Sequence, residues 1–133
     1  MMTLSVHDNL LVSYEVQCEK RVITLRTEFR EKSKTKEFTN VVFKGVEAYH
    51  FQGDAFGNII FDVAEFPTEQ LLKDFGSEVS ELYRYNARPE WASNLASAPE
   101  HLESEGIKGF VLSSSYGLGG WILAKEMSII AVD

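Results

Sequence analysis

Apolar and polar residues alternate along most of the first half of the chain, a pattern typical of strands that bury one face. From Leu10 to Cys18 the apolar side chains occupy every second position. After Lys20 the alternation restarts, with Ile23 and Leu25 on one side and charged residues on the other. A short polar turn separates the two runs. We therefore predict a hairpin, with Cys18 on its buried face and a solvated charged face on the second strand.

A longer apolar run extends from Phe38 to Phe51, and its phase slips at Gly45. A glycine at such a slip indicates a bulge or a close approach between backbones. After a turn over 52–58, the segment 59–64 is apolar on both sides, which is typical of a central strand. We expect these two strands to pair with each other.

The spacing changes to a helical period near the middle of the chain. Apolar residues recur every three or four positions from Leu71 to Leu82, which predicts a helix that begins at Thr68. Thr68 is expected to cap this helix, and the acid that follows it suits the positive end of the helix dipole. Gly76 interrupts the pattern, so 77–85 is compatible with a continued helix or with a strand.

A second, shorter helix is predicted before the C-terminal strands. Ser97 followed by Glu100 matches a capping box, and a glycine at the far end suits a helix stop. Beyond it, alternating segments over 110–114 and 121–125 flank a glycine-rich turn and predict another hairpin. Residues 129–132 form a last strand or the end of the same one.

The order of strands, helices and strands predicts an α+β fold, a mostly antiparallel sheet built from hairpins with one or two helices packed on one face. A length of 133 residues corresponds to a single domain over 1–133. Apolar runs stay far below the roughly 20 residues of a membrane-spanning helix, and the first residues lack the features of a signal peptide. One cysteine cannot form an internal disulfide, so we expect a cytoplasmic protein.

The net charge of −7 is distributed unevenly. Residues 1–44 hold eight Lys/Arg and six Asp/Glu, a charge of +2, whereas residues 45–133 hold five and fourteen, a charge of −9. Nucleic-acid binding needs cations that face phosphate, so this balance argues against it. An acidic surface suits a basic protein partner, although the same charge also serves solubility. The mixed-charge stretch 31–37 is expected to be a solvated hairpin tip.

The search for catalytic chemistry yields no motif. His7, His50 and His101 lie in different predicted elements, and none has a His or Cys neighbour at ligand spacing. His50, beside two aromatic residues, is interpreted as a residue at the edge of the core. The turn 115–120 matches neither a phosphate loop nor a nucleophile elbow. We predict no catalytic residue, no metal site and no cofactor, and we favour a binding protein over an enzyme.

A surface prediction remains for the acidic middle of the chain. Acidic side chains are interleaved there with aromatic rings, which are common binding anchors. Opposite charge on a partner would speed the encounter. The candidate partner-binding residues are Asp54, Asp62, Glu65, Glu69, Asp74, Glu78, Tyr83, Tyr85 and Trp91. The alternative for each ring is a place in the core.

Four segments resemble, in their layout, small bacterial proteins of immunity-type and uncharacterised families. They are HDNL at 7–10 with the hairpin after it, NVVFKGV at 40–46, GNIIFDV at 57–63 and SSSYGLGGW at 113–121. Immunity proteins of this kind are cytoplasmic, non-enzymatic and often acidic, and they block a secreted toxin domain, often a basic nuclease. The resemblance therefore implies neutralisation of a basic toxin domain. It carries over no individual residue, because these families share no fixed inhibitory motif.

Two other functions stay open at this point. A small-ligand-binding protein or an enzyme would need a pocket between sheet and helices, expected to be lined by Tyr49, Phe61, Tyr83 and Trp121. A structural subunit of a homo-oligomer would instead pair edge strands or hairpins. The sequence predicts neither the identity of a protein partner nor the oligomeric state.

Overall fold

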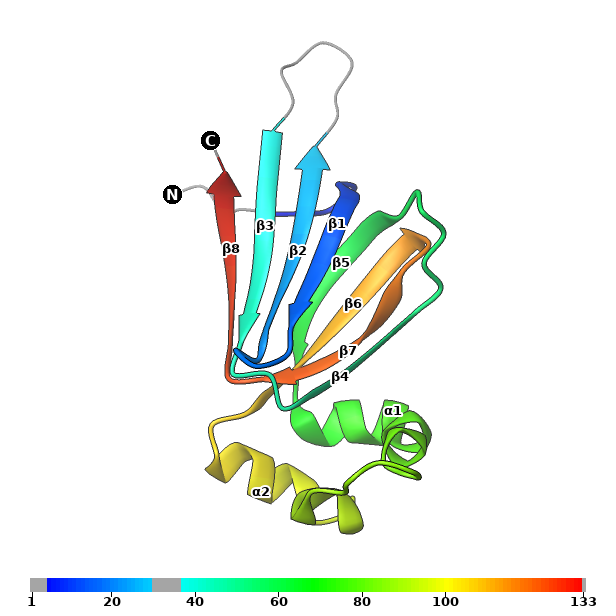
Figure 1. The fold of residues 1–133 in the computed structure, drawn as a ribbon, viewed down its shortest axis with the longest axis vertical. Coiled ribbons are helices and arrows are strands. Elements are labelled where there is room, and N and C mark those ends of the chain that lie inside the picture. Colours follow the sequence, from blue (N-terminus) through cyan, green and yellow to red (C-terminus); the bar gives the residue numbers. More distant parts are fainter. Residues whose placement is uncertain (1–4, 30–36, 133) are drawn as a thin grey trace.

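The computed structural model describes residues 5–29 and 37–132, which form a curled sheet with a layer of helices at one end (Figure 1). The elements in chain order are β1 (Leu10–Gln17), β2 (Val22–Phe29), β3 (Glu37–Lys44), β4 (Ala48–Gln52), β5 (Ile59–Phe66), α1 (Thr68–Leu82), the 3-10 helix η1 (Glu90–Ser93), α2 (Ala98–Ser104), β6 (Lys108–Tyr116), β7 (Gly119–Ala124) and β8 (Glu126–Val132). The predicted α+β class is confirmed. Of the stretch 31–37, all but Glu37 lies outside the described residues. Helix α1 has 15 residues, and in the described ranges no helix has the length and apolar character to cross a membrane.

The eight strands form one antiparallel sheet in the order β4–β7–β6–β5–β1–β2–β3–β8. The predicted hairpins β1–β2 and β6–β7 are confirmed, and β5 is central, between β6 and β1. The expected pairing of the third and fourth strands is wrong, because the long apolar run divides into β3 and β4. Strand β3 pairs with β2 and β8, whereas β4 pairs with β7. Residues Glu126–Val132 form a strand of their own, β8.

The sheet curls because two long strands bend at the same place. Strand β3 leads to β4 through Gly45, and β7 leads to β8 through Lys125. The N–H of Lys125 donates to the carbonyl oxygens of Lys44 and Gly45, at 3.0 and 3.2 Å. Gly45 has a φ of +64°, which glycine adopts without the cost that a Cβ imposes. The expected close backbone approach at Gly45 is therefore confirmed, and it sends β4 and β7 to the opposite end of the strand order from β3 and β8.

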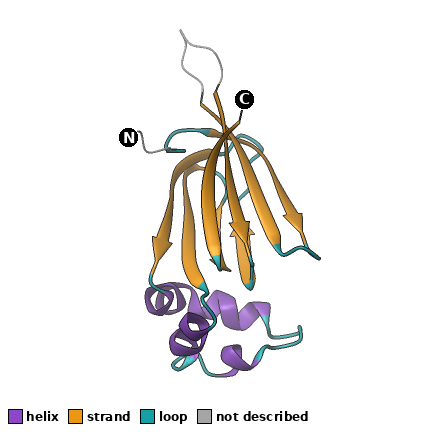
Figure 2. Ribbon diagram, turned by 90° about the vertical axis from the view of Figure 1, so that its left-hand side faces the viewer, coloured by secondary structure: helices purple, strands orange, loops and turns teal. Residues whose placement is uncertain are grey.

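The curl separates two cores. On the inner face, Ile23, Phe43 and Phe110 are buried together with side chains from most other strands. On the outer face of β6 and β7, Val111 and Trp121 pack under α1, η1 and α2. Alternate residues of β6 and β7 thus enter different cores, which explains why these strands are apolar on both sides. Figure 2 shows the helices as a layer across one end of the strands.

Helix α1 continues to Leu82, so residues 77–82 of the segment that could have been a strand are helical and residues 83–85 follow the helix. The interruption is a kink at Phe75. Both predicted side-chain caps are wrong. The hydroxyl of Thr68 donates to Glu103 of α2, at 3.2 Å, instead of capping α1. Ser97 precedes α2 but makes no capping hydrogen bond with its side chain. The Thr68 hydroxyl therefore links the two helices rather than closing one end.

A bulge changes the faces of β1. The pairing of β1 with β2 shifts between Leu11 and Ser13, so Leu11 enters the core while Val12 is 51% exposed. The expectation that Cys18 lies on the buried face is wrong, because Cys18 is exposed in the turn after β1. On β2 the expected solvated face is also wrong at Glu28, which is buried.

Candidate functional site

The nine candidate partner-binding residues divide among several places in the fold. Asp54 belongs to the loop after β4, which stands at the end of the sheet away from the helices (Figure 1). Asp62 and Glu65 are exposed on β5, and Trp91 lies in η1. The largest group lies on α1 and directly after it: Glu69, Asp74, Glu78, Tyr83 and Tyr85. Five of the nine therefore belong to one helix and the residues directly after it, and the other four lie elsewhere.

Asp54 takes part in an internal hydrogen-bond network. Its Oδ2 accepts from the hydroxyl of Tyr14 at 2.9 Å, and its Oδ1 accepts from Nδ2 of Asn58 at 2.8 Å and from the N–H of Phe56 at 2.9 Å. These bonds lower the pKa of Asp54, with the Asn58 amide as the largest cause. The bond to Asp54 raises the pKa of Tyr14 in turn. Asp54 thus stabilises its own loop.

We define the helical surface as the acids of α1 together with the tyrosine that follows the helix: Glu69, Asp74, Glu78, Glu81 and Tyr85. Residues 68–106 carry eight Asp/Glu and three Lys/Arg, a net charge of −5. Two cationic or titratable neighbours approach this surface among the described residues: Arg84 lies 3.6 Å from Glu81, and Nδ1 of His50 lies 3.8 Å from Glu78. Glu69 and Asp74 are exposed. Glu69 and Asp74 are therefore the two acids of this surface that have no such neighbour among the described residues.

Trp91 lies in the core beneath the helices rather than on a surface. Its side chain is 6% exposed, and its ring meets that of Tyr83 edge-on with centroids 5.8 Å apart. The alternative of a core role thus holds for Trp91, because the outer face of β6 and β7 needs a large apolar cover there. Tyr83 is half-buried between this core and the solvent.

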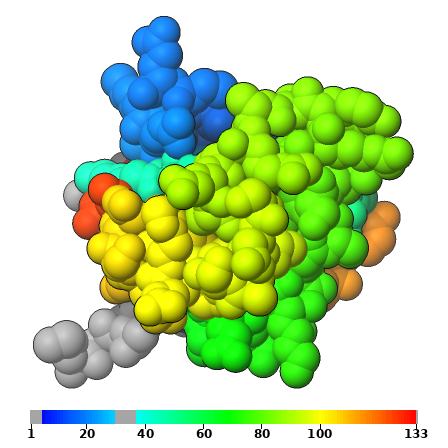
Figure 3. All heavy atoms as spheres, turned by 90° about the horizontal axis from the view of Figure 1, so that it is seen from below, coloured from blue at the N-terminus to red at the C-terminus, as the bar shows by residue number. Residues whose placement is uncertain are grey.

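A pocket of about 400 Å³ opens where the β1–β2 turn, the β3–β4 bend and the end of α1 meet. Figure 3 shows the turn (blue) beside the end of α1 (yellow-green) at the helical end of the molecule. Apolar lining comes from Val16, Val22, Ile23, Val46, Ala48, Tyr49 and Leu82. Polar lining comes from Gln17, Cys18, Arg21, Glu47, Tyr83 and Asn86. Apolar walls with a few converging polar groups are the usual composition of small-molecule sites, which span about 300–1,000 Å³.

Arg21 and Glu47 bring opposite charges to this pocket. Nη1 of Arg21 donates to the carbonyl of Val46 at 3.0 Å, and the N–H of Val46 donates to the carbonyl of Arg21 at 3.0 Å. These two bonds fasten the turn to the bend. Burial raises the pKa of the Tyr83 hydroxyl, the charge of Glu47 raises it further, and the charge of Arg21 opposes the rise. The hydroxyl therefore lies within electrostatic reach of both charged groups.

The pocket differs from the one that the sequence predicts. Of the four expected lining residues, Tyr49 and Tyr83 line it, whereas Phe61 is exposed on β5 and Trp121 is fully buried. The sequence pattern does not mark Arg21 or Glu47 as site residues. They are separated by the whole of β2 and β3, and only the curl of the sheet brings them together.

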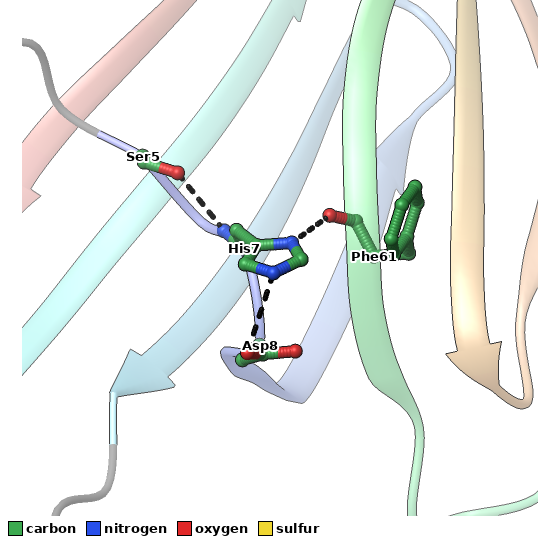
Figure 4. Close-up of polar contacts among 4 residues, drawn as sticks. All are labelled: Ser5, His7, Asp8 and Phe61. Carbon is green, nitrogen blue, oxygen red and sulfur yellow. Dashed lines mark hydrogen bonds and ion pairs between the residues drawn. The ribbon is translucent and has the colours of Figure 1, made fainter.

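His7 fastens the N-terminal segment to β5 (Figure 4). Its Nδ1 lies 2.6 Å from the carbonyl oxygen of Phe61, and because a carbonyl only accepts, Nδ1 is the donor. Its Nε2 lies 3.3 Å from Asp8, and its N–H donates to Oγ of Ser5 at 3.1 Å. The imidazole also meets the Phe61 ring edge-on at 5.3 Å. These contacts are those of a residue that positions the chain rather than of a catalytic base.

In the part of the chain that the structure describes, no cluster of three or more His, Cys, Asp or Glu could hold a metal ion. His50, at the edge of the core as expected, stacks on Trp121 at 6.5 Å. Comparison with protein-family models, with curated proteins and with solved structures gives no match to this chain. The function is therefore argued from the geometry of the helical surface and the pocket.

Proposed function

We propose that this chain is a non-catalytic protein-binding module whose helical surface binds a basic partner. The supporting observation is the concentration of negative charge in the helical layer, a net −5 over residues 68–106, with Glu69, Asp74 and Glu81 exposed on α1. A surface of one sign steers an oppositely charged partner and raises the rate of productive encounter. The same charges disfavour association with nucleic acid.

Tyr85 supplies a candidate anchor next to these acids. Its side chain is 83% exposed directly after α1, and the guanidinium of Arg84 lies 5.3 Å from the centroid of its ring. A tyrosine loses little rotamer entropy on binding and buries a large apolar area, which makes it a frequent hot-spot residue. The acids would set the encounter rate, and the tyrosine would slow dissociation.

The layout resemblance to immunity-type proteins supports a partner class, a basic toxin domain such as a nuclease. The carboxylates of α1 would occupy the cationic surface with which a nuclease binds phosphate. Neutralisation by occupancy needs no catalytic residue in this chain. A bacterial origin and a cytoplasmic location belong to the same proposal.

The test begins with the genes adjacent to that of this chain: a toxin domain encoded there is purified and mixed with this chain in stopped flow. We expect an inhibited complex and an association rate that falls at least about tenfold between 50 mM and 500 mM salt, because salt screens exposed charges. Absence of a complex would overturn the partner class. An association rate that does not change with salt concentration would overturn the role of the acidic surface.

The pocket favours a second candidate function, the binding of a small ligand. It borders the helical surface at Tyr83, which belongs to the pocket lining. Its volume of about 400 Å³ and its mixed lining fit a small organic molecule rather than a macromolecule.

A further inference from the structure

The pocket at the β1–β2 turn has features that the binding of a basic protein does not use. Its walls come from three segments that are distant in the sequence, and the Arg21–Val46 bonds hold two of them together. A site built from hydrogen-bonded turns is largely preformed, so ligand binding would cost the protein little conformational entropy.

The apolar lining and the volume of the pocket limit the size of the apolar part of a ligand. Val16, Val22, Ala48 and Leu82 contribute aliphatic surface, and Tyr49 adds an aromatic ring. A volume of about 400 Å³ exceeds that of one aliphatic or aromatic side chain with its polar head, so such a molecule fits with room for water. A large cofactor would fill the pocket and extend well into the solvent.

The charged residues of the pocket indicate which charged groups a ligand would carry. Arg21 uses one of its guanidinium donors on the Val46 carbonyl, and the rest of the fork can bind a carboxylate. Among the described residues, Glu47 makes no ion pair, and its carboxylate can accept from an ammonium group. Arg21, Glu47 and Tyr83 line the same pocket, so the two charges share one locality. A ligand with a single charge would leave one of the two partly desolvated and unpaired, which is costly.

We propose that this pocket binds a free α-amino acid with an apolar side chain, with the carboxylate on Arg21, the ammonium group near Glu47 and the side chain on the apolar walls. The Tyr83 hydroxyl would donate a further hydrogen bond to the carboxylate. This inference rests on the second candidate function, small-ligand binding, and names its ligand class; it is independent of the proposed protein-binding function.

The experiment is isothermal titration calorimetry of the full chain with L-leucine and L-phenylalanine. Each is compared with its amide, which lacks the carboxylate, and with its N-acetyl derivative, which lacks the ammonium group. We expect the free amino acids to bind at least about tenfold more tightly than either derivative, the size of a lost charge-assisted hydrogen bond. No binding of any free amino acid, or equal affinity for all three forms, would overturn the proposal.

Two variants assign the charges. E47Q should abolish the preference for the free amino acid over the N-acetyl form and keep the preference over the amide. R21M should do the reverse, and R21K, which keeps the charge but loses the guanidinium fork, should weaken the preference over the amide without abolishing it. The matched controls are E15Q and R26M, exposed on β1 and β2 outside the pocket lining. Should R21M fail to fold, E47Q and R21K decide the outcome, and unchanged preferences in E47Q would contradict the assignment.

Cys18 provides an independent readout of location. It is the chain's single cysteine, it is exposed, and it lines the pocket. Saturating L-leucine or L-phenylalanine should slow alkylation of Cys18 by N-ethylmaleimide at least about threefold, because an occupied pocket shields part of its lining. Calorimetric binding without any protection of Cys18 would place the amino acid elsewhere and overturn the site.

Discussion

A Cβ atom at Gly45 would lie 2.9 Å from the Cβ of Lys125, at the point where both long strands bend. Because Gly45 also has a φ of +64°, G45A combines a clash with backbone strain. We expect G45A to lower the free energy of unfolding by about 2 kcal/mol or more, measured by urea denaturation.

Gly57 provides the matched control for G45A. A Cβ there would meet no atom within 4 Å, and its φ lies outside the left-handed region. G57A should stay within about 0.5 kcal/mol of the wild type. Equal effects of the two substitutions would mean that the bend at Gly45 does not hold the curled sheet.

Asn58 joins two loops that are 60 residues apart. Its buried Oδ1 accepts from the N–H of Leu118 at 2.8 Å and from the N–H of Ala55 at 2.9 Å. N58A leaves the buried N–H of Leu118 without this acceptor, so we expect a loss of about 2–4 kcal/mol in urea unfolding. The control N94A removes an exposed side-chain acceptor and should cost less than about 1 kcal/mol. A loss at N58A no larger than that at N94A would argue against the loop connection.

The Tyr14–Asp54 hydrogen bond predicts a pH-dependent stability. Asp54 has a pKa below its ordinary 3.8, so its contribution is present above that value and is lost as the pH falls through the lowered pKa. Tyr14 has a pKa above its ordinary 10.0, so its contribution is present below pH 10.0 and is lost as the pH rises through the raised pKa. The difference in unfolding free energy between wild type and Y14F should therefore be largest near pH 7 and smaller at pH 2 and pH 11. A difference that does not vary with pH would show that this bond does not couple the two titrations.

Trp91 and Tyr85 are both candidate partner-binding residues, but their substitution should have opposite effects on stability and on partner binding. W91A removes a buried ring and should cost about 3–5 kcal/mol of stability, with little direct effect on a partner beyond unfolding. Y85A removes an exposed ring and should leave stability within about 0.5 kcal/mol while speeding dissociation of the partner. Urea denaturation and surface plasmon resonance measure the two effects, and a stable W91A would contradict the core role of Trp91.

The parts of the fold that can be predicted are those that follow from the local spacing of apolar residues. The hairpins and α1 follow from periods of two and of three to four residues, and the phase slip at Gly45 marks a real bend. The change of partner at that bend is not predictable, because β4 pairs with a strand about 70 residues away. The buried position expected for Cys18 fails because β1 ends at Gln17 and Cys18 lies in the turn that follows, a boundary that the alternation does not mark.

The candidate site residues likewise divide into those that local pattern predicts and those that only the fold brings together. The acids of α1 share one predicted element, whereas Asp54 and Trp91 are placed by contacts that are distant in the sequence. The pocket joins Arg21 of a turn with Glu47 of a bend, and only the curled sheet makes them neighbours. Neither residue belongs to a sequence motif that would indicate a binding site.

The most direct test of the central claim compares two charge-reversed variants for association with the partner toxin domain at low salt. E69K/D74K/E81K reverses the helical surface, and E15K/E37K/E126K reverses three exposed acids of the sheet with the same change in net charge. We predict that the helical variant associates at least about tenfold more slowly than wild type and the sheet variant less than about threefold more slowly. Equal slowing by both variants, or none by either, would contradict a binding surface on α1.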